Sequence, residues 1–167
     1  DVPESPGDSS VNVQPSRKEF DLTPFLPSQC GATTLEEARQ AVIYLRIKTT
    51  SGEESSGTGF IVTSTGHFLT AYHVVENAIQ IKASFEAEPD RFIEAEVLGW
   101  DKNADLAVLQ LTDKRSHSYV LLAGQEFVPS LDEEVGVLGY PLGEELGREI
   151  TFTRGTVNSV RRVEELQ

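Results

Sequence analysis

The 167-residue sequence lacks several features that would assign it to a familiar class of protein. It contains one cysteine, Cys30, so no disulfide can form within the chain, and we expect packing alone to stabilise the fold. No apolar run approaches the roughly 20 residues that a membrane-spanning helix needs. The first residues also lack the basic and apolar regions of a signal peptide. We therefore expect a soluble protein without a membrane span, and the sequence does not specify its compartment.

Basic side chains and histidines are also scarce. Lysine and arginine number 14 against 27 acidic residues, which gives a net charge of −13 at pH 7. Nucleic acids and anionic membranes bind clustered basic side chains, so neither is an expected partner. Of the three histidines, His67 and His117 have no companion at a spacing typical of zinc ligands. We expect no metal site and no cofactor.

The composition divides the chain into three parts. Residues 1–32 are rich in proline, serine and acidic residues, which is typical of a solvated arm. Near its end, Phe20, Leu22, Phe25 and Leu26 could tether the arm to the domain, or the arm could be an exposed linker. We predict that residues 33–118 form a β-barrel and that residues 119–167 begin a second, incomplete β-barrel.

Short segments with alternating apolar and polar residues indicate an all-β fold. Six such strands lie between about residues 41 and 111, and this spacing favours a closed antiparallel barrel or a sandwich. The predicted strands are 43–48, 60–62, 68–71, 79–85, 93–97 and 106–111, with turns at Ser51-Gly52, Pro89-Asp90 and Lys102-Asn103. A capping box at Thr34 and Glu37 predicts a short helix through about Gln40 before the first strand. The second series of strands is predicted at 119–122, 134–139 and 150–160.

Two residues are candidates for catalysis. His73 follows a predicted hairpin turned at Gly66, and Asp105 immediately precedes an apolar strand. A buried carboxylate that accepts the imidazole Nδ1 proton fixes the tautomer and leaves Nε2 free to act as a general base. Such a histidine can also be an ordinary core or surface residue, and such an aspartate commonly forms a turn. Asp101 competes with Asp105, although its position favours capping of the turn.

Five motifs, in order and with matching spacing over about residues 35–162, resemble trypsin-like serine proteases of the HtrA (high-temperature-requirement) type. Gly57-Thr-Gly-Phe-Ile is similar to the family's Gly-Ser-Gly-Phe-Ile, and Leu69-Thr-Ala-Tyr-His73-Val-Val to its Leu-Thr-x-x-His-Val-Val. Ala104-Asp105-Leu-Ala-Val-Leu resembles Thr-Asp-Leu-Ala-Val-Leu. Val137-Leu-Gly-Tyr-Pro-Leu-Gly143 resembles Ala-Ile-Gly-Asn-Pro-Phe-Gly, and Arg154-Gly-Thr-Val-Asn-Ser-Val resembles a Gly-Ile-Val-Ser strand.

The resemblance implies two six-stranded barrels with the catalytic groups in the cleft between them. It assigns His73 and Asp105 to a Ser-His-Asp triad that hydrolyses polypeptides. The nucleophilic serine should follow the last strand, in a carboxy-terminal segment or a second chain, so this chain alone is expected to be inactive. The four serines considered as substitutes are unsuitable, because they lie in the arm, in the hairpin turn or within a presumed strand; these are Ser9, Ser10, Ser64 and Ser159.

Other interpretations follow from the same residues. The chain could be a non-catalytic, protease-like binding or scaffold module that retains the histidine and aspartate by descent, or a structural β domain in which His73 only packs. Members of the HtrA type often form trimers, so a homo-oligomer is a further expectation. The type allows an extracytoplasmic compartment without specifying one. Cys30 is expected to be a bystander thiol rather than a nucleophile.

Overall fold

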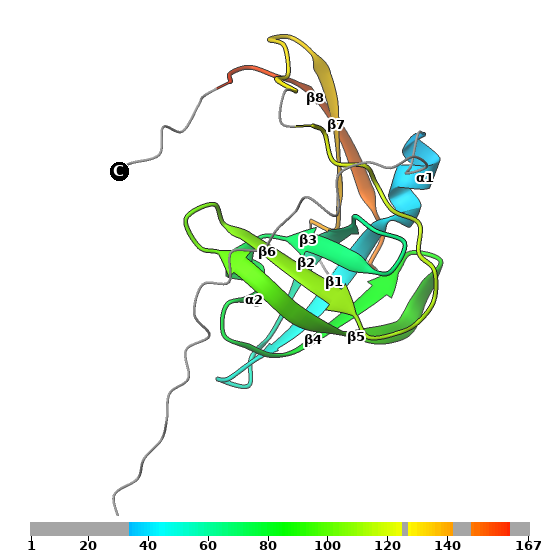
Figure 1. The fold of residues 1–167 in the computed structure, drawn as a ribbon, viewed down its shortest axis with the longest axis vertical. Helices are drawn as coiled ribbons and strands as arrows, with labels where there is room; N and C mark the ends of the chain where they lie inside the picture. The colour runs from blue at the N-terminus through cyan, green and yellow to red at the C-terminus, as the bar shows by residue number, and fades with distance from the viewer. Residues whose placement is uncertain (1–33, 125–126, 142–147, 161–167) are drawn as a thin grey trace, which may run out of the picture.

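A computed structural model of the chain describes residues 34–124, 127–141 and 148–160 (Figure 1). The proposed tether in the arm, Cys30, Ser9 and Ser10 lie outside these residues. The elements in chain order are α1 (Leu35–Gln40), β1 (Val42–Thr49), β2 (Glu54–Ile61), β3 (His67–Thr70), α2 (Tyr72–Val75), β4 (Ala78–Phe85), β5 (Glu88–Asp101), β6 (Leu106–Leu111), β7 (Glu134–Gly139) and β8 (Thr151–Thr156).

The first six strands form a closed antiparallel barrel in the order β1-β2-β3-β6-β5-β4. This confirms the predicted barrel. Its interior is filled by apolar side chains from every strand, because alternate residues of a strand point to the same face. In β1, for example, Ile43, Leu45 and Ile47 are fully buried inside the barrel.

The hairpin of β2 and β3 agrees with the sequence. Phe60 pairs with Leu69 and Ile61 pairs with Phe68. Gly66 has a φ of 88°, in the left-handed region that favours glycine, and Ser64 lies in the turn as predicted. The hairpin therefore delivers the chain after Thr70 to one end of the barrel.

The helix α1 also begins where the sequence predicts. The Thr34 hydroxyl accepts a hydrogen bond from the backbone N–H of Glu37, and the Glu37 carboxylate accepts one from the N–H of Thr34. This reciprocal capping box confirms the prediction and places the helix directly before β1.

Three predictions of local structure are wrong. Pro89 and Asp90 lie inside β5 rather than in a turn, because the turn is at residues 86–87, and a register irregularity between Ala83 and Phe85 adapts the β4–β5 pairing beside the proline. Residues 119–122 form no strand, although the Val120 N–H donates to the Ile61 carbonyl. The strand expected over 150–160 ends at Thr156, so Ser159 lies outside it.

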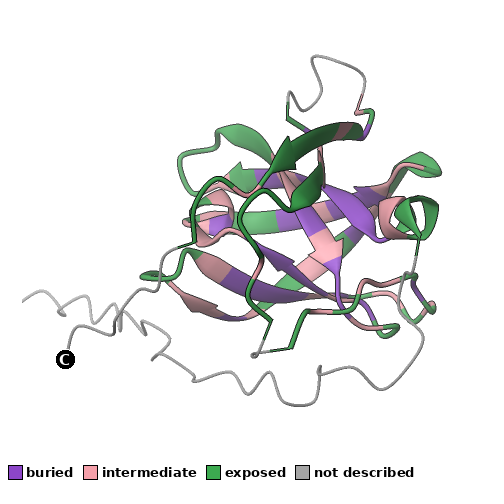
Figure 2. Cartoon of the chain, turned by 90° about the horizontal axis from the view of Figure 1, so that it is seen from above, coloured by how far each residue is buried: buried purple, intermediate pink, exposed green. Residues whose placement is uncertain are grey.

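The strands β7 and β8 form a separate two-stranded antiparallel sheet beside the barrel (Figure 1). Most of their residues are exposed, in contrast to the buried strands of the barrel (Figure 2). The fold is therefore all-β and consistent with a trypsin-like double barrel. The domain boundaries given above remain predictions.

The two-stranded sheet is joined to the barrel through β1 and β2. The Tyr140 N–H donates to the Thr58 hydroxyl oxygen over 2.9 Å, and the Tyr140 ring packs edge-on against Tyr44. Val42 and Tyr44, which point out of the barrel, are buried together with Tyr140 and Ile150. Both faces of β1 are therefore covered at this end.

Both helices that the structure describes, α1 and α2, are far too short to span a membrane.

Candidate catalytic site

The pairing of β3 with β6 brings His73 and Asp105 to the same end of the barrel. Thr70, the last residue of β3, is opposite Ala107 in β6. The chain that leaves β3 and the turn that enters β6 therefore emerge side by side, with α2 at the β5–β6 turn (Figure 1). His73 lies on α2, a single helical turn, rather than at the strand-to-loop junction that the sequence indicated.

The helical turn that carries His73 packs closely on the barrel. Val75 is buried in the core, and Val74 lies against β2. A Cβ atom on Gly57 would lie 2.5 Å from Val74 Cγ1, so only glycine leaves enough room at that position. The first glycine of the Gly57-Thr-Gly motif therefore allows α2 to approach β2.

The turn that carries Asp105 is shaped by Asp101. The Asp101 carboxylate accepts hydrogen bonds from the N–H groups of Asn103 and Ala104, at 2.8 and 3.1 Å. This confirms the capping role expected for Asp101. Asp105 itself has a φ of 51°, a left-handed conformation that aspartate tolerates better than most residues.

The two carboxylate oxygens of Asp105 each accept a hydrogen bond from His73. Oδ1 lies 2.9 Å from the His73 backbone nitrogen, and Oδ2 lies 2.7 Å from Nδ1 of its ring. Because a carboxylate only accepts, the ring donates its Nδ1 proton, which leaves Nε2 as the proton acceptor. In the described part of the chain, Nε2 has no hydrogen-bond partner.

The pair is exposed rather than buried as expected. The side chains retain 69% of their accessible surface in His73 and 49% in Asp105. Even so, the pKa of Asp105 lies below its ordinary value of 3.8, first because the His73 backbone N–H donates to it and second because the ring does. Asp105 is therefore ionised at neutral pH, so that its two oxygens act only as hydrogen-bond acceptors.

This lowered pKa predicts how the pair responds to acid. Because the folded-state value is depressed, the stability that Asp105 contributes is present above pH 3.8 and is lost as the pH falls through the folded-state pKa. We expect carboxyl carbon NMR to give a pKa below 3.8 for Asp105 in the native chain, and a higher one in the His73→Ala variant. An Asp105 pKa at or above the ordinary value in the native chain would contradict the hydrogen-bonded arrangement.

A cluster of side chains that the sequence did not indicate surrounds the pair. The Tyr72 ring stacks on Trp100, with centroids 6.2 Å apart and planes inclined by 25°. Lys102 Nζ lies 5.7 Å from the Tyr72 ring centroid and 3.0 Å from Glu76 Oε1. Tyr72 and Glu76 belong to the helical turn of His73 and its end, whereas Trp100 and Lys102 lead into the turn of Asp105. The only available sequence signal was the single tryptophan.

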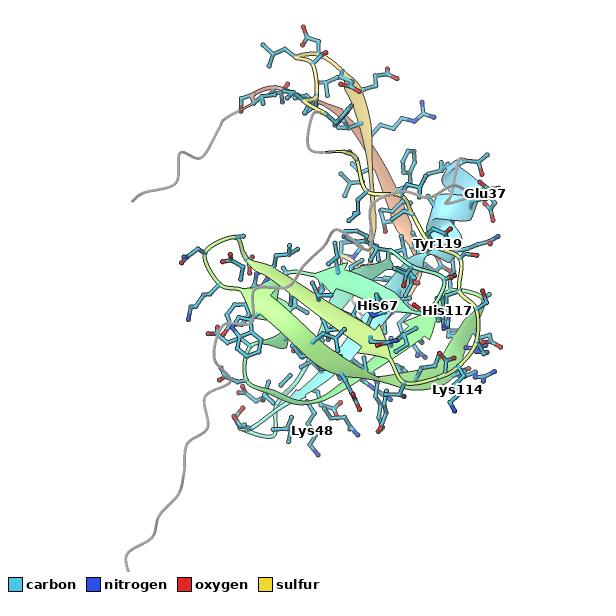
Figure 3. All side chains as sticks on the ribbon, viewed as in Figure 1. Glu37, Lys48, His67, Lys114, His117 and Tyr119 are labelled. Atoms are coloured by element: carbon cyan, nitrogen blue, oxygen red, sulfur yellow. The ribbon has the colours of Figure 1, made fainter. Side chains whose placement is uncertain are left out.

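The other two histidines lie apart from this pair, and Figure 3 labels both. Nδ1 of His67 contacts the hydroxyls of Thr63 and Thr65, and burial lowers the His67 pKa. His117 is buried, although it lies in the loop that follows β6: Nε2 lies 2.8 Å from Asp113, and its ring stacks on Phe85. Within residues 34–124, 127–141 and 148–160, no group of three or more potential ligands could hold a metal ion.

Comparisons with known proteins identify relatives of this chain. The sequence profile of the trypsin-like peptidase domain matches residues 57–167. The chain is 31% identical to the serine protease Do-like HtrA of Bacillus subtilis over 142 residues, which is 81% of this chain and 30% of that protein. It is 30% identical to the chloroplastic protease Do-like 1 of Arabidopsis thaliana over 109 residues, 65% of this chain and 24% of that protein.

Solved structures agree with these relatives. The HtrA-type protease AlgW, solved with a tripeptide, superimposes with a TM-score of 0.64 at 27% identity and covers 78% of this chain and 40% of its own. The serine endoprotease from Yersinia pestis gives a TM-score of 0.61 at 27% identity, over 74% of this chain and 42% of its own. The chain thus spans less than half of each of these relatives. It belongs to the trypsin-like peptidase family and, within it, to the HtrA or Do type.

Proposed function

We propose that this chain supplies the general base, His73, and the orienting carboxylate, Asp105, of a serine endopeptidase. The observation that supports this most directly is the double hydrogen bond between the two residues. One contact holds the ring through Nδ1, the other holds the backbone, and Nε2 remains available for a proton. The family relationship favours peptide-bond hydrolysis, and a polypeptide is the proposed substrate.

In the proposed reaction, a serine hydroxyl attacks the peptide carbonyl while Nε2 of His73 takes its proton. The resulting imidazolium is stabilised by the carboxylate of Asp105 and then gives the proton to the leaving amine. Water hydrolyses the acyl-enzyme by the reverse sequence of proton transfers. The same Asp105 contacts would hold the ring in place throughout both halves of the reaction.

We infer that the nucleophile comes from outside residues 1–167, in a longer polypeptide or a separate chain. Ser64 is unsuitable because the whole length of β3 separates its turn from α2, and its carbonyl accepts the N–H of His117. Ser159 follows the end of β8, the second strand of the two-stranded sheet, and so belongs to neither α2 nor the β5–β6 turn. In this proposal, the 167 residues alone do not hydrolyse peptides.

An acylating fluorophosphonate probe tests the proposal. We expect no labelling of the 167-residue chain, and labelling of a serine beyond Gln167 when the natural polypeptide continues past that residue. The matched control is His73→Ala in the longer polypeptide, which should remove the labelling. Labelling of the short chain at a serine would overturn the proposed source of the nucleophile. No labelling of a folded longer polypeptide would favour the scaffold interpretation instead.

A further inference from the structure

We propose that Tyr72 is a positioning residue for His73, acting through the stack of its ring on Trp100. The inference deepens the proposed function, because it concerns how the same histidine is held against Asp105. Tyr72 immediately precedes His73 and begins α2, and Trp100 lies in β5 just before the turn that carries Asp105. The ring contact therefore joins the two segments that must stay in register for the His73–Asp105 pair to form.

The helical turn cannot hold this geometry by itself. It has four residues, and its N-cap, Ala71, offers no side chain to the free backbone N–H groups. A single turn is far below the length at which a helix is stable alone, so tertiary contacts must fix it. On one side these contacts are Val74 against β2 and Val75 in the core. On the side of the β5–β6 turn, the Tyr72 ring stacks on Trp100, and two such rings form a large apolar contact.

The polar contacts of the same cluster are weaker candidates for this role. Lys102 and Glu76 are 3.0 Å apart, but the lysine side chain is 70% exposed, and exposed ion pairs contribute little. The Tyr72 hydroxyl donates to Glu76 over 3.4 Å, which is long for such a bond. The His73–Asp105 contacts are themselves open to water, which competes for them. We therefore assign the positioning to the ring of Tyr72 rather than to its hydroxyl.

Substitutions at Tyr72 and Trp100 in the 167-residue chain distinguish the role of the Tyr72 ring from the role of its hydroxyl. The readout is the Asp105 pKa by carboxyl carbon NMR, which is lowered chiefly by the two hydrogen bonds from His73 and less by the Tyr72 backbone, which every variant retains. In Tyr72→Phe we expect the value of the native chain. In Tyr72→Ala and in Trp100→Leu we expect it to rise toward the ordinary value of 3.8. Amide exchange of the β1 and β6 core verifies that each variant remains folded, and Trp100 emission reports the loss of the stack in Tyr72→Ala.

Tyr72→Ala and Trp100→Leu each remove one ring of the stack. If one of these variants does not fold, the other still tests the proposal. An unchanged Asp105 pKa in a folded Tyr72→Ala variant would overturn the assignment, as would a raised value in Tyr72→Phe. The titration needs no turnover, so the positioning role can hold or fail independently of the proposed activity. Where the longer polypeptide is active, we expect Tyr72→Ala to lower kcat about 10- to 100-fold with little change in KM. A fall in kcat equally large in Tyr72→Phe would contradict the role of the ring.

Discussion

Replacing His73 by alanine is expected to lower kcat/KM of the longer polypeptide by on the order of 10⁴- to 10⁶-fold. The variant would lack the only group in the described site that is placed to take the proton of a nucleophile, since Nε2 is available and Nδ1 is committed to Asp105. The serine would then have to attack without a general base to remove its hydroxyl proton. The loss is measured in a steady-state assay with an unfolded polypeptide as substrate. The signal is the free amine that each hydrolysed peptide bond releases.

The matched control for this prediction is His67→Ala. His67 starts β3, six residues before His73, and its ring contacts the hydroxyls of Thr63 and Thr65. Its removal should leave kcat/KM within about threefold of the native value, because His67 begins β3, at the opposite end of that strand from α2. A His73→Ala variant that is folded and retains more than a tenth of the native activity would refute the assignment of the base.

We expect Asp105→Asn to lower kcat by about 10⁴-fold. The asparagine could still accept the backbone N–H of His73 through its amide oxygen and so preserve the turn. Its amide nitrogen, however, is a donor and cannot accept a hydrogen bond from the Nδ1–H group of His73. The ring would then carry its proton on Nε2, which is the wrong tautomer for a base, and the imidazolium would lose its counterion.

The comparison with Asp101→Asn decides between the two aspartates. An asparagine oxygen can replace the Asp101 oxygen that accepts the N–H groups of Asn103 and Ala104, so this variant should keep most of its activity. Single-turnover measurements of acylation in both variants are the appropriate assay. A loss of activity in Asp101→Asn that matches or exceeds the loss in Asp105→Asn would reverse the assignment.

The local features of the fold could be predicted where each depends on neighbouring residues. The cap of α1 at Thr34, the turn at Gly66 and the barrel strands follow from short-range rules of capping, backbone conformation and alternation. Pro89 was assigned to a turn because proline commonly marks one. The irregular pairing of β4 with β5, a tertiary feature, accommodates it within a strand.

Features that depend on distant residues could not be predicted in the same way. The alternation in β1 indicated one buried face, but Val42 and Tyr44 on the opposite face are covered by Tyr140, nearly a hundred residues later. The motifs indicated His73 and Asp105 as partners, whereas their exposure and the stack of Tyr72 on Trp100 depend on how β3, β5 and β6 meet. No pattern within either motif contains that information.

The contact between Tyr140 and β1 has a practical consequence for dissecting the protein. A fragment cut after residue 118, where composition would place the end of the barrel, would leave Val42 and Tyr44 facing water and the Thr58 hydroxyl without its donor. An exposed apolar patch of this kind on a closed barrel promotes self-association and aggregation. The shortest stretch that keeps β1 covered therefore runs past Ile150, so the first barrel alone is a poor unit for expression.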